Sequence, residues 1–115
     1  MNVPTRAAVL TNLRRGTLEF CVLAYLAHEP AYGLDIARRL GAKPVLLESE
    51  GTLYPLLSRL RKSGWVVTRW EESESGSPRR YYALTDDGRT ALDAFARTWD
   101  EFRDSVDAVL REGKR

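Results

Sequence analysis

The sequence predicts a mainly α-helical fold with one small β-hairpin, in which three helices are followed by two strands and a long final helix. Three observations carry this prediction. Apolar residues recur at helical spacing in three successive segments, the pattern then changes to β-branched and aromatic residues, and residues 85–115 return to helical spacing. No repeat or long linker divides the chain, so we expect one compact unit.

The first three helices follow from apolar stripes and the residues that end them. The stripes lie at about 17–27, 32–40 and 50–63, and they end near Pro30, Gly41 and Gly64, respectively. Residues 1–16, before the first stripe, are expected to form an N-terminal arm or a short helix.

The start of the third helix has two interpretations, because Pro55 lies close to it. If Thr52 is the N-cap residue, Pro55 falls in the first turn, where proline is tolerated. If Ser49 is the N-cap residue, the helix must bend at Pro55. The sequence leaves both open.

Two strands are predicted after Gly64. Residues 65–71 contain two Val, two Trp and one Thr, and residues 79–84 contain two adjacent Tyr. These β-branched and aromatic residues favour strands. Residues 72–78 between them are polar and include Gly76 and Pro78, as is typical of a hairpin loop.

A final helix is predicted to begin after Thr85, whose hydroxyl suits the N-cap position. Its apolar residues follow the alternating spacing of three and four that is typical of a coiled-coil seam. These residues are Leu92, Phe95, Trp99, Phe102, Val106 and Val109. We therefore interpret residues 85–115 as a C-terminal dimerisation helix with these six residues in a homodimer interface. The alternative is that the helix packs only on its own domain.

Three helices followed by a hairpin is the order of a winged helix-turn-helix domain, which we assign to residues 17–84. In helix-turn-helix proteins the recognition helix enters the major groove of DNA. Residues 1–84 contain 12 Lys and Arg against 8 Asp and Glu, whereas residues 85–115 contain 6 against 8. A basic body suits a polyanion, but this excess alone does not establish nucleic-acid binding, and winged helices also serve as protein-interaction modules.

Candidate DNA-binding residues gather in the third helix and the hairpin. Hydroxyl groups at a helix N-terminus and a cationic helix face suit phosphate and base contacts, and arginine suits phosphate or a narrow minor groove. The predicted residues are Tyr32, Ser49, Thr52, Tyr54, Arg59, Lys62, Ser77, Arg79 and Arg80.

Several segments resemble the PadR family of bacterial transcriptional regulators. They include Ala31-Tyr32-Gly33-Leu34-Asp35-Ile36, Gly51-Thr52-Leu53-Tyr54-Pro55-Leu56 and Arg79-Arg80-Tyr81-Tyr82-Ala83-Leu84-Thr85-Asp86-Asp87-Gly88, and the similarity covers about residues 17–90. With its single C-terminal helix the chain is similar to the compact subfamily. The resemblance implies a transcriptional repressor that binds a palindromic double-stranded DNA operator as a homodimer and is released by a small molecule.

The seam suggests where such a molecule binds. Trp99 lies at its centre with Phe95 and Phe102 nearby, so two chains would bring six aromatic rings together. A gap between two indoles accepts a flat aromatic or cationic compound by stacking and cation–π attraction, and some compact PadR-like proteins bind such compounds there. The alternative is that Trp99 only packs in the interface. For the whole chain, two rival functions stay open: a protein-interaction module and a DNA-binding protein without small-molecule control.

The sequence predicts no enzymatic activity, no metal site and no cofactor. His28 has no second ligand residue nearby, and Cys21, the single cysteine, lies in the first helical stripe and is expected to pack in the core. No apolar run approaches the ~18 residues of a membrane helix, and the first ten residues are too polar for a secretory signal. We expect a cytoplasmic protein without a membrane partner.

Overall fold

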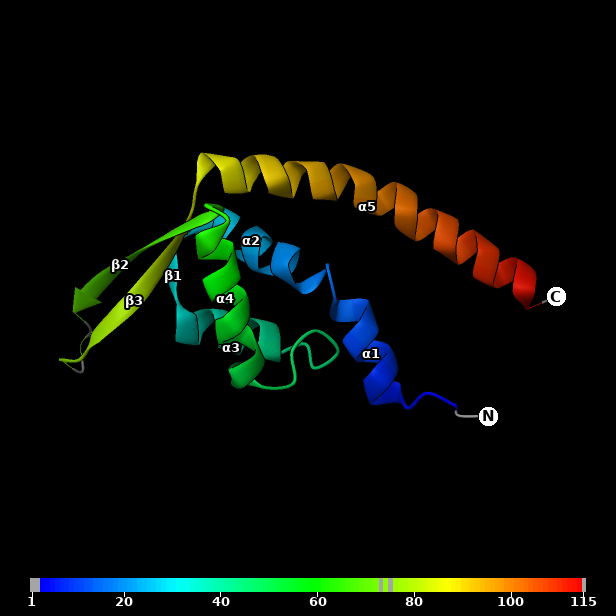
Figure 1. Cartoon of the computed structure of the whole chain (residues 1–115), viewed down its shortest axis with the longest axis horizontal. Helices are drawn as coiled ribbons and strands as arrows, with labels where there is room; N and C mark the ends of the chain where they lie inside the picture. The colour runs from blue at the N-terminus through cyan, green and yellow to red at the C-terminus, as the bar shows by residue number, and fades with distance from the viewer. Residues whose placement is uncertain (1–2, 73, 75, 115) are drawn as a thin grey trace.

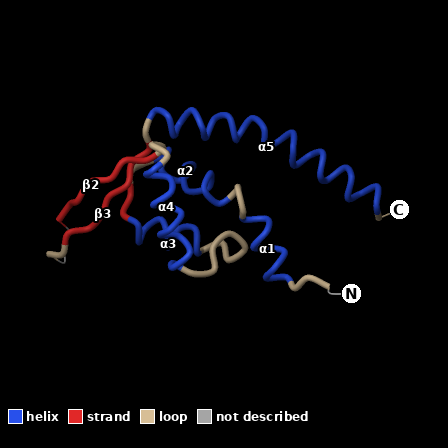
Figure 2. Tube along the Cα trace, viewed as in Figure 1, coloured by secondary structure: helices blue, strands red, loops and turns tan. Residues whose placement is uncertain are grey.

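The structure, a computed structural model, describes residues 3–72, 74 and 76–114 and confirms the predicted fold class (Figure 1). In chain order its elements are α1 (Arg6–Arg14), α2 (Leu18–His28), β1 (Ala31–Tyr32), α3 (Gly33–Gly41), the 3-10 helix η1 (Glu50–Thr52), α4 (Leu53–Lys62), β2 (Val66–Glu72), β3 (Pro78–Leu84) and α5 (Asp86–Gly113). β2 and β3 project from one side of the helices, and α5 extends in the opposite direction, past the end of α2 (Figure 2). Within the described residues, no helix is both long and apolar enough to cross a membrane.

The apolar stripes of α2, α3 and α4 meet in one core. Leu23 of α2, Ile36 of α3 and Leu53 and Leu57 of α4 are fully buried there. Burying one such side chain stabilises a fold by about 1.5–3 kcal/mol relative to exposing it. The core therefore holds α4 against α2 and α3 and leaves the opposite side of α4 in solvent.

The start of α4 agrees with the first interpretation of the Pro55 region, and a short 3-10 helix precedes it. Ser49 is the N-cap residue of η1, and Thr52 is the N-cap residue of α4, so Pro55 is the third residue of α4. At this position the missing amide hydrogen interrupts no helical hydrogen bond. The Thr52 hydroxyl donates to the Ser49 carbonyl at 2.9 Å instead of capping α4.

The sheet contains a third strand that the sequence pattern did not indicate. β1 pairs antiparallel with β3, and the strand order is β1-β3-β2. Because β1 has only two residues, it shows no alternation, and the helix expected from about residue 32 begins at Gly33. β2 and β3 form the wing; of the predicted loop 72–78, residues 73 and 75 lie outside the described residues.

α5 starts on the core and then leaves it. As predicted, Thr85 is its N-cap residue: the hydroxyl accepts a hydrogen bond from the Gly88 amide at 3.0 Å and donates to the Gly64 carbonyl at 2.6 Å. Ala91 and Leu92 pack against the core, and every residue of α5 after Phe95 is exposed. The second half of α5 therefore projects away from the domain (Figure 1).

Candidate nucleic-acid interface

α4 presents a polar and cationic face to solvent. Its four leucines face the core, and each successive residue turns about 100° around the helix axis. This turn places Lys62 in the middle of the outer face, Tyr54 and Arg61 along one edge and Arg59 along the other. All four side chains are exposed.

The edge with Tyr54 and Arg61 adjoins the wing. A methyl group built on Gly33 would lie 3.2 Å from Tyr54 Cε1 and 3.6 Å from Tyr82 Cε1, so the two tyrosines meet at this glycine. Burial raises the pKa of Tyr82, and the positive charges of Arg80 and Arg61 oppose that rise. α4 and β3 therefore share one surface around Tyr82.

Strand alternation divides the wing into two faces. Arg79 and Arg80 are neighbours in β3, so their side chains leave the strand on opposite faces. Arg80 shares its face with Tyr82, which is buried against the helices, whereas Arg79 shares its face with Tyr81. Of the two wing arginines predicted to bind DNA, only Arg80 lies on the α4 side. Ser77, just before β3, is exposed.

On the α4 side of the wing, Arg80 is held by two neighbours on β2. Its Cζ atom lies 4.8 Å from the centre of the Trp70 ring, and its Nη1 atom donates to Thr68 Oγ1 at 3.2 Å. Trp70 is nevertheless 64% exposed. Arginine carries five N–H donors, so the guanidinium can still bind an acceptor outside the chain.

The opposite face of the wing holds an interlocked group of Tyr32, Arg69, Glu71, Arg79 and Tyr81. The Tyr32 hydroxyl and Arg69 Nε both donate to the Glu71 carboxylate, at 3.3 and 2.7 Å. The Arg69 guanidinium lies 4.7 Å from the centre of the Tyr81 ring, and that of Arg79 lies 5.8 Å from the centre of the Tyr32 ring. Partial burial and the Glu71 carboxylate raise the pKa of Tyr32. The predicted residues Tyr32 and Arg79 thus lie together, on the face opposite Arg80.

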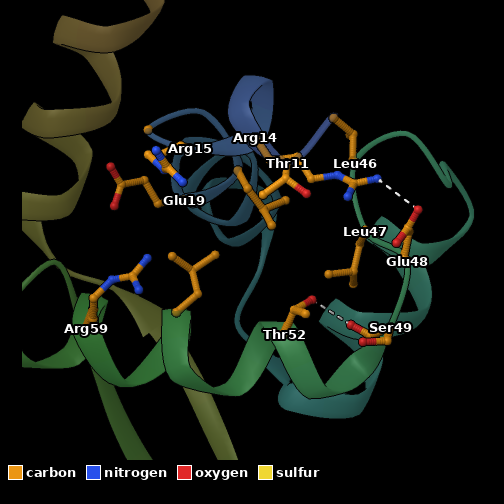
Figure 3. Close-up of a pocket in the computed structure, with 13 residues that line it drawn as sticks. Thr11, Arg14, Arg15, Glu19, Leu46, Leu47, Glu48, Ser49, Thr52 and Arg59 are labelled. Carbon is orange, nitrogen blue, oxygen red and sulfur yellow. Dashed lines mark hydrogen bonds and ion pairs between the residues drawn. The ribbon is translucent and has the colours of Figure 1, made fainter. Parts of the chain in front are cut away.

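A hollow of about 450 Å³ lies on the far edge of α4, bounded by α1, α2 and the segment before η1 (Figure 3). Ser49, Thr52 and Arg59 line it from the side of α4. Arg14 of α1 closes another wall. Its guanidinium donates to the backbone carbonyls of Val45 at 2.8 Å and Pro44 at 3.0 Å, both in the segment before η1. Three predicted DNA-binding residues are therefore together here, separate from the edge of α4 that adjoins the wing.

The six predicted seam residues of α5 fall into two groups. Leu92 and Phe95 are half-buried on the domain, and the Phe95 ring stacks on Phe20 of α2 with centroids 4.2 Å apart. The other four are exposed, together with Leu110, and form an apolar stripe along the projecting half of the helix: Trp99, Phe102, Val106 and Val109.

Four aromatic rings connect the base of the wing to α5. The ring of Trp65, just before β2, has its centroid 5.8 Å from that of Phe20. Phe20 stacks on Phe95, and the centroids of Phe95 and Trp99 are 5.8 Å apart. We call these four residues the aromatic ladder. Two of the predicted ligand-binding residues, Phe95 and Trp99, belong to it, and Phe102 lies further along the exposed stripe.

The cysteine, the histidine and the carboxylates are the remaining candidates for metal ligands or reactive groups. Within the described residues, no group of three or more His, Cys, Asp or Glu side chains is arranged to hold a metal ion. Cys21 is half-buried in α2, and burial raises the pKa of its thiol, which disfavours the reactive thiolate. His28 is exposed at the end of α2.

Comparison with known proteins decides the family. Residues 22–94 match the transcriptional regulator PadR-like family. The chain belongs to this family. Its fold is similar to that of a PadR family transcriptional regulator from Eggerthella lenta, with 36% identity, 90% of each chain covered and a TM-score of 0.78. It is also similar to a PadR-like transcription factor from Bacteroides fragilis, with 39% identity over 88% of this chain and 97% of that one and a TM-score of 0.72. A PadR-like regulator from Bacillus cereus is 31% identical over 86% of this chain and 96% of that one, with a TM-score of 0.76.

The resemblance predicted from the sequence is therefore confirmed, and the chain is a PadR-like transcriptional regulator with a winged helix-turn-helix fold. The matched residues 22–94 include α3, α4, the wing and the part of α5 that packs on the core. The exposed stripe from Trp99 onward lies outside the match.

Two side chains of this PadR-like regulator's wing were not singled out from the sequence, Trp70 and Thr68. Period-two alternation from the buried Val66 places both on the core-facing side of β2. The sequence alone did not show which β3 residues lie opposite them, because the register depends on the geometry of the hairpin loop.

Proposed function

We propose that this PadR-like regulator is a transcriptional repressor that binds a palindromic operator as a homodimer. One observation carries the proposal: a continuous surface runs from the outer face of α4 to the α4 side of the wing, with Lys62, Arg61 and Arg80 on it. α4 is the second helix of the helix-turn-helix and would enter the major groove. Arg80 would then reach the backbone of the same duplex.

The predicted DNA-binding residues take different parts in this proposal. Tyr54 lies in the first turn of α4 and faces the bases, because the N-terminal residues of a recognition helix contact base edges, whereas Lys62 at the end of α4 contacts phosphate. Ser77, just before β3, is placed next to the DNA backbone. Tyr32 and Arg79 hold the wing in place through Glu71 and the ring contacts around it.

The far edge of α4 is proposed to contact the DNA backbone through Ser49, Thr52 and Arg59. They line one wall of the hollow beside α1, where two hydroxyl groups and a guanidinium suit phosphate oxygens. Backbone contacts on both edges of a recognition helix would set its depth and orientation in the groove without reading sequence.

The exposed half of α5 is the proposed dimer contact. Trp99 is 37% exposed and Phe102 62%, and a continuous apolar stripe of this kind is unusual on the surface of a monomer. The spacing of three and four suits pairing with the same helix of a second copy. A two-fold axis through α5 would present two α4 helices to two half-sites, which explains a palindromic operator.

A small aromatic effector is the proposed control. Trp99 ends the aromatic ladder on the exposed stripe, with Phe95 and Phe102 on the same side of α5, so a flat ring has aromatic faces to stack on. Through Phe95 and Phe20 the ladder reaches Trp65 at the base of the wing. A ligand that displaces Trp99 would shift the wing and α4 relative to the two half-sites and so weaken operator binding.

Selection from a pool of random-sequence duplexes with the purified protein tests this function. We expect enrichment of a palindrome with two equivalent half-sites, bound by a dimer. A protein-interaction module would enrich no sequence and would refute the proposal. A DNA-binding protein without an effector would enrich a palindrome, but its affinity for that palindrome would not change on addition of any compound in a broad panel of planar aromatics. That result would refute only the proposed regulation by an effector.

A further inference from the structure

We propose that Trp70 and Arg80 form a minor-groove contact that makes this regulator prefer A·T base pairs beside each half-site. The inference rests on the proposed function as a DNA-binding protein. It adds a determinant of sequence preference in the wing to the major-groove contacts of α4, and it assigns Trp70 the role of holding Arg80 in position.

The first argument is the exposure of Trp70. Its neighbours on the same sheet face, Val66 and Tyr82, are buried, but Trp70 lies beyond the core and is 64% exposed. A large exposed aromatic side chain on a structured strand is typical of a binding surface, because its apolar area gains from being covered. Trp70 contributes nothing to the described core, so a partner is the better explanation.

The second argument is that Arg80 is positioned before anything binds. The Trp70 ring lies 4.8 Å from its Cζ atom, and Thr68 Oγ1 accepts a hydrogen bond from its Nη1 at 3.2 Å. Two contacts from the neighbouring strand restrict the rotamers of a long side chain, and this lowers the entropy that binding must still remove.

The third argument is the charge of the two wing faces. Arg79, on the opposite face, lies over the Tyr32 ring beside the Glu71 carboxylate, which repels phosphate. On the face of Arg80, alternation places the carboxylate of Glu72 at the last position of β2, beyond the Trp70–Arg80 pair. The strand charges alone do not separate the two faces, since Arg69 and Arg79 accompany Glu71 on one and Arg80 accompanies Glu72 on the other. The α4 side is the face that suits a polyanion because it also adjoins Arg61 and Lys62 of α4.

The fourth argument is continuity with α4. Tyr54 and Tyr82 meet at Gly33, and the charges of Arg61 and Arg80 both act on Tyr82, so the pair lies beside the wing edge of α4. A helix fills the major groove, which is about 12 Å wide, so a group beside it reaches the next backbone and minor groove. A narrow A·T minor groove attracts arginine, and apolar side chains also enter minor grooves.

The test compares two adjacent arginines, with Arg80→Gln as the variant and Arg79→Gln as its matched control on the other face. The probe is the palindrome selected by the wild-type protein, with its flanking base pairs as A·T, G·C or inosine·C. Inosine lacks the minor-groove amino group of guanine, so I·C resembles A·T in that groove. Wild-type protein is expected to bind A·T and I·C flanks alike and G·C flanks about tenfold more weakly. Arg79→Gln is expected to keep this ratio between the duplexes, even where the lost contact with Tyr32 weakens binding to all three alike.

Arg80→Gln is expected to lose this preference, and Arg80→Lys is expected to lose it while keeping the dependence of binding on salt, because lysine keeps the charge without the planar fork. Trp70→Leu should reduce the preference about threefold, and Trp70→Phe should reduce it less because a ring remains. Circular dichroism of each variant checks its folding.

A second readout does not depend on affinity. The fluorescence change of wild-type protein on binding the A·T-flanked duplex, minus that of Trp70→Phe, reports contact of DNA with the indole. Three results would each overturn the inference while leaving DNA binding intact. They are an unchanged A·T preference in Arg80→Gln, an equal loss of that preference in Arg79→Gln and Arg80→Gln, and no fluorescence difference attributable to Trp70. If the wild-type protein selects no sequence at all, the proposed function fails, and this inference fails with it.

Discussion

Replacing Gly88 by alanine should destabilise the domain, although alanine forms helices better than glycine. Gly88 is buried in the first turn of α5, where the helix lies directly against Trp65 in the segment between α4 and β2. A methyl group there would overlap the carbonyl oxygen of Trp65 and lie 2.7 Å from Leu84 Cδ1. The Trp65 carbonyl also accepts a hydrogen bond from the Thr85 amide at 3.1 Å, so it is not free to move.

The magnitude follows from three opposing effects. Alanine gains about 1 kcal/mol of helix propensity over glycine. Overpacking costs about 1–3 kcal/mol, and the upper value applies because the clash is with fixed backbone. Moving α5 outward also strains the Thr85–Trp65 hydrogen bond, worth about 1 kcal/mol. The expected net loss for Gly88→Ala is about 3 kcal/mol.

Urea unfolding at one fixed protomer concentration measures this loss, since the proposed dimerisation would make stability depend on concentration. Gly41→Ala is the matched control: it changes another helical glycine, at the end of α3, where no atom lies within 4 Å of the added methyl group. The control should lose no stability and can gain up to about 1 kcal/mol of helix propensity. If Gly88→Ala is as stable as Gly41→Ala, the close approach of α5 to Trp65 is wrong.

Four further predictions concern the cap, the dimer, the DNA interface and the effector. Thr85→Ala should cost about 1 kcal/mol in urea unfolding and Thr85→Ser much less, because serine keeps the capping hydroxyl; equal losses would deny the cap. Phe102→Glu with Val106→Glu should sediment as a monomer while Ala108→Glu, on the other side of α5, stays dimeric, and a dimeric double variant would place the interface elsewhere. If Arg59, Arg61 and Lys62 of both protomers contact phosphates, the logarithm of the binding constant should fall with the logarithm of the salt concentration with a slope of about −5. A flat profile would contradict the interface. Planar aromatic cations should quench wild-type fluorescence more than that of Trp99→Phe, and equal quenching would leave Trp99 as packing only.

Much of the fold was predictable because its determinants are local. The leucines of α4 and the stripes of α2 and α3 repeat with the period of a helix, and Thr85 precedes α5 as a capping residue. The family motifs are also local, so short runs of residues such as Gly51-Thr52-Leu53-Tyr54-Pro55 are enough to indicate the PadR family. β1 was missed because two residues show no period, and only its pairing with β3 makes it a strand.

The candidate site was predictable only in composition. The sequence identified the cationic and hydroxyl side chains of the third helix and the wing, because residue type determines which groups bind phosphate. It did not determine that Arg80 stacks on Trp70 while Arg79 turns toward Tyr32, since these contacts depend on the register of β2 on β3.

The sequence by itself determined the helices, the two long strands, the family and the types of side chain available for binding, since each depends on residues close together in the chain. Only the tertiary structure decided that Leu92 and Phe95 pack on the domain while Trp99 and the residues beyond it remain exposed. All lie on one regular seam, and periodicity is the same along its whole length. The difference arises where α5 passes the end of the core, a position set by the close packing of Gly88 on Trp65, far apart in sequence but adjacent in space.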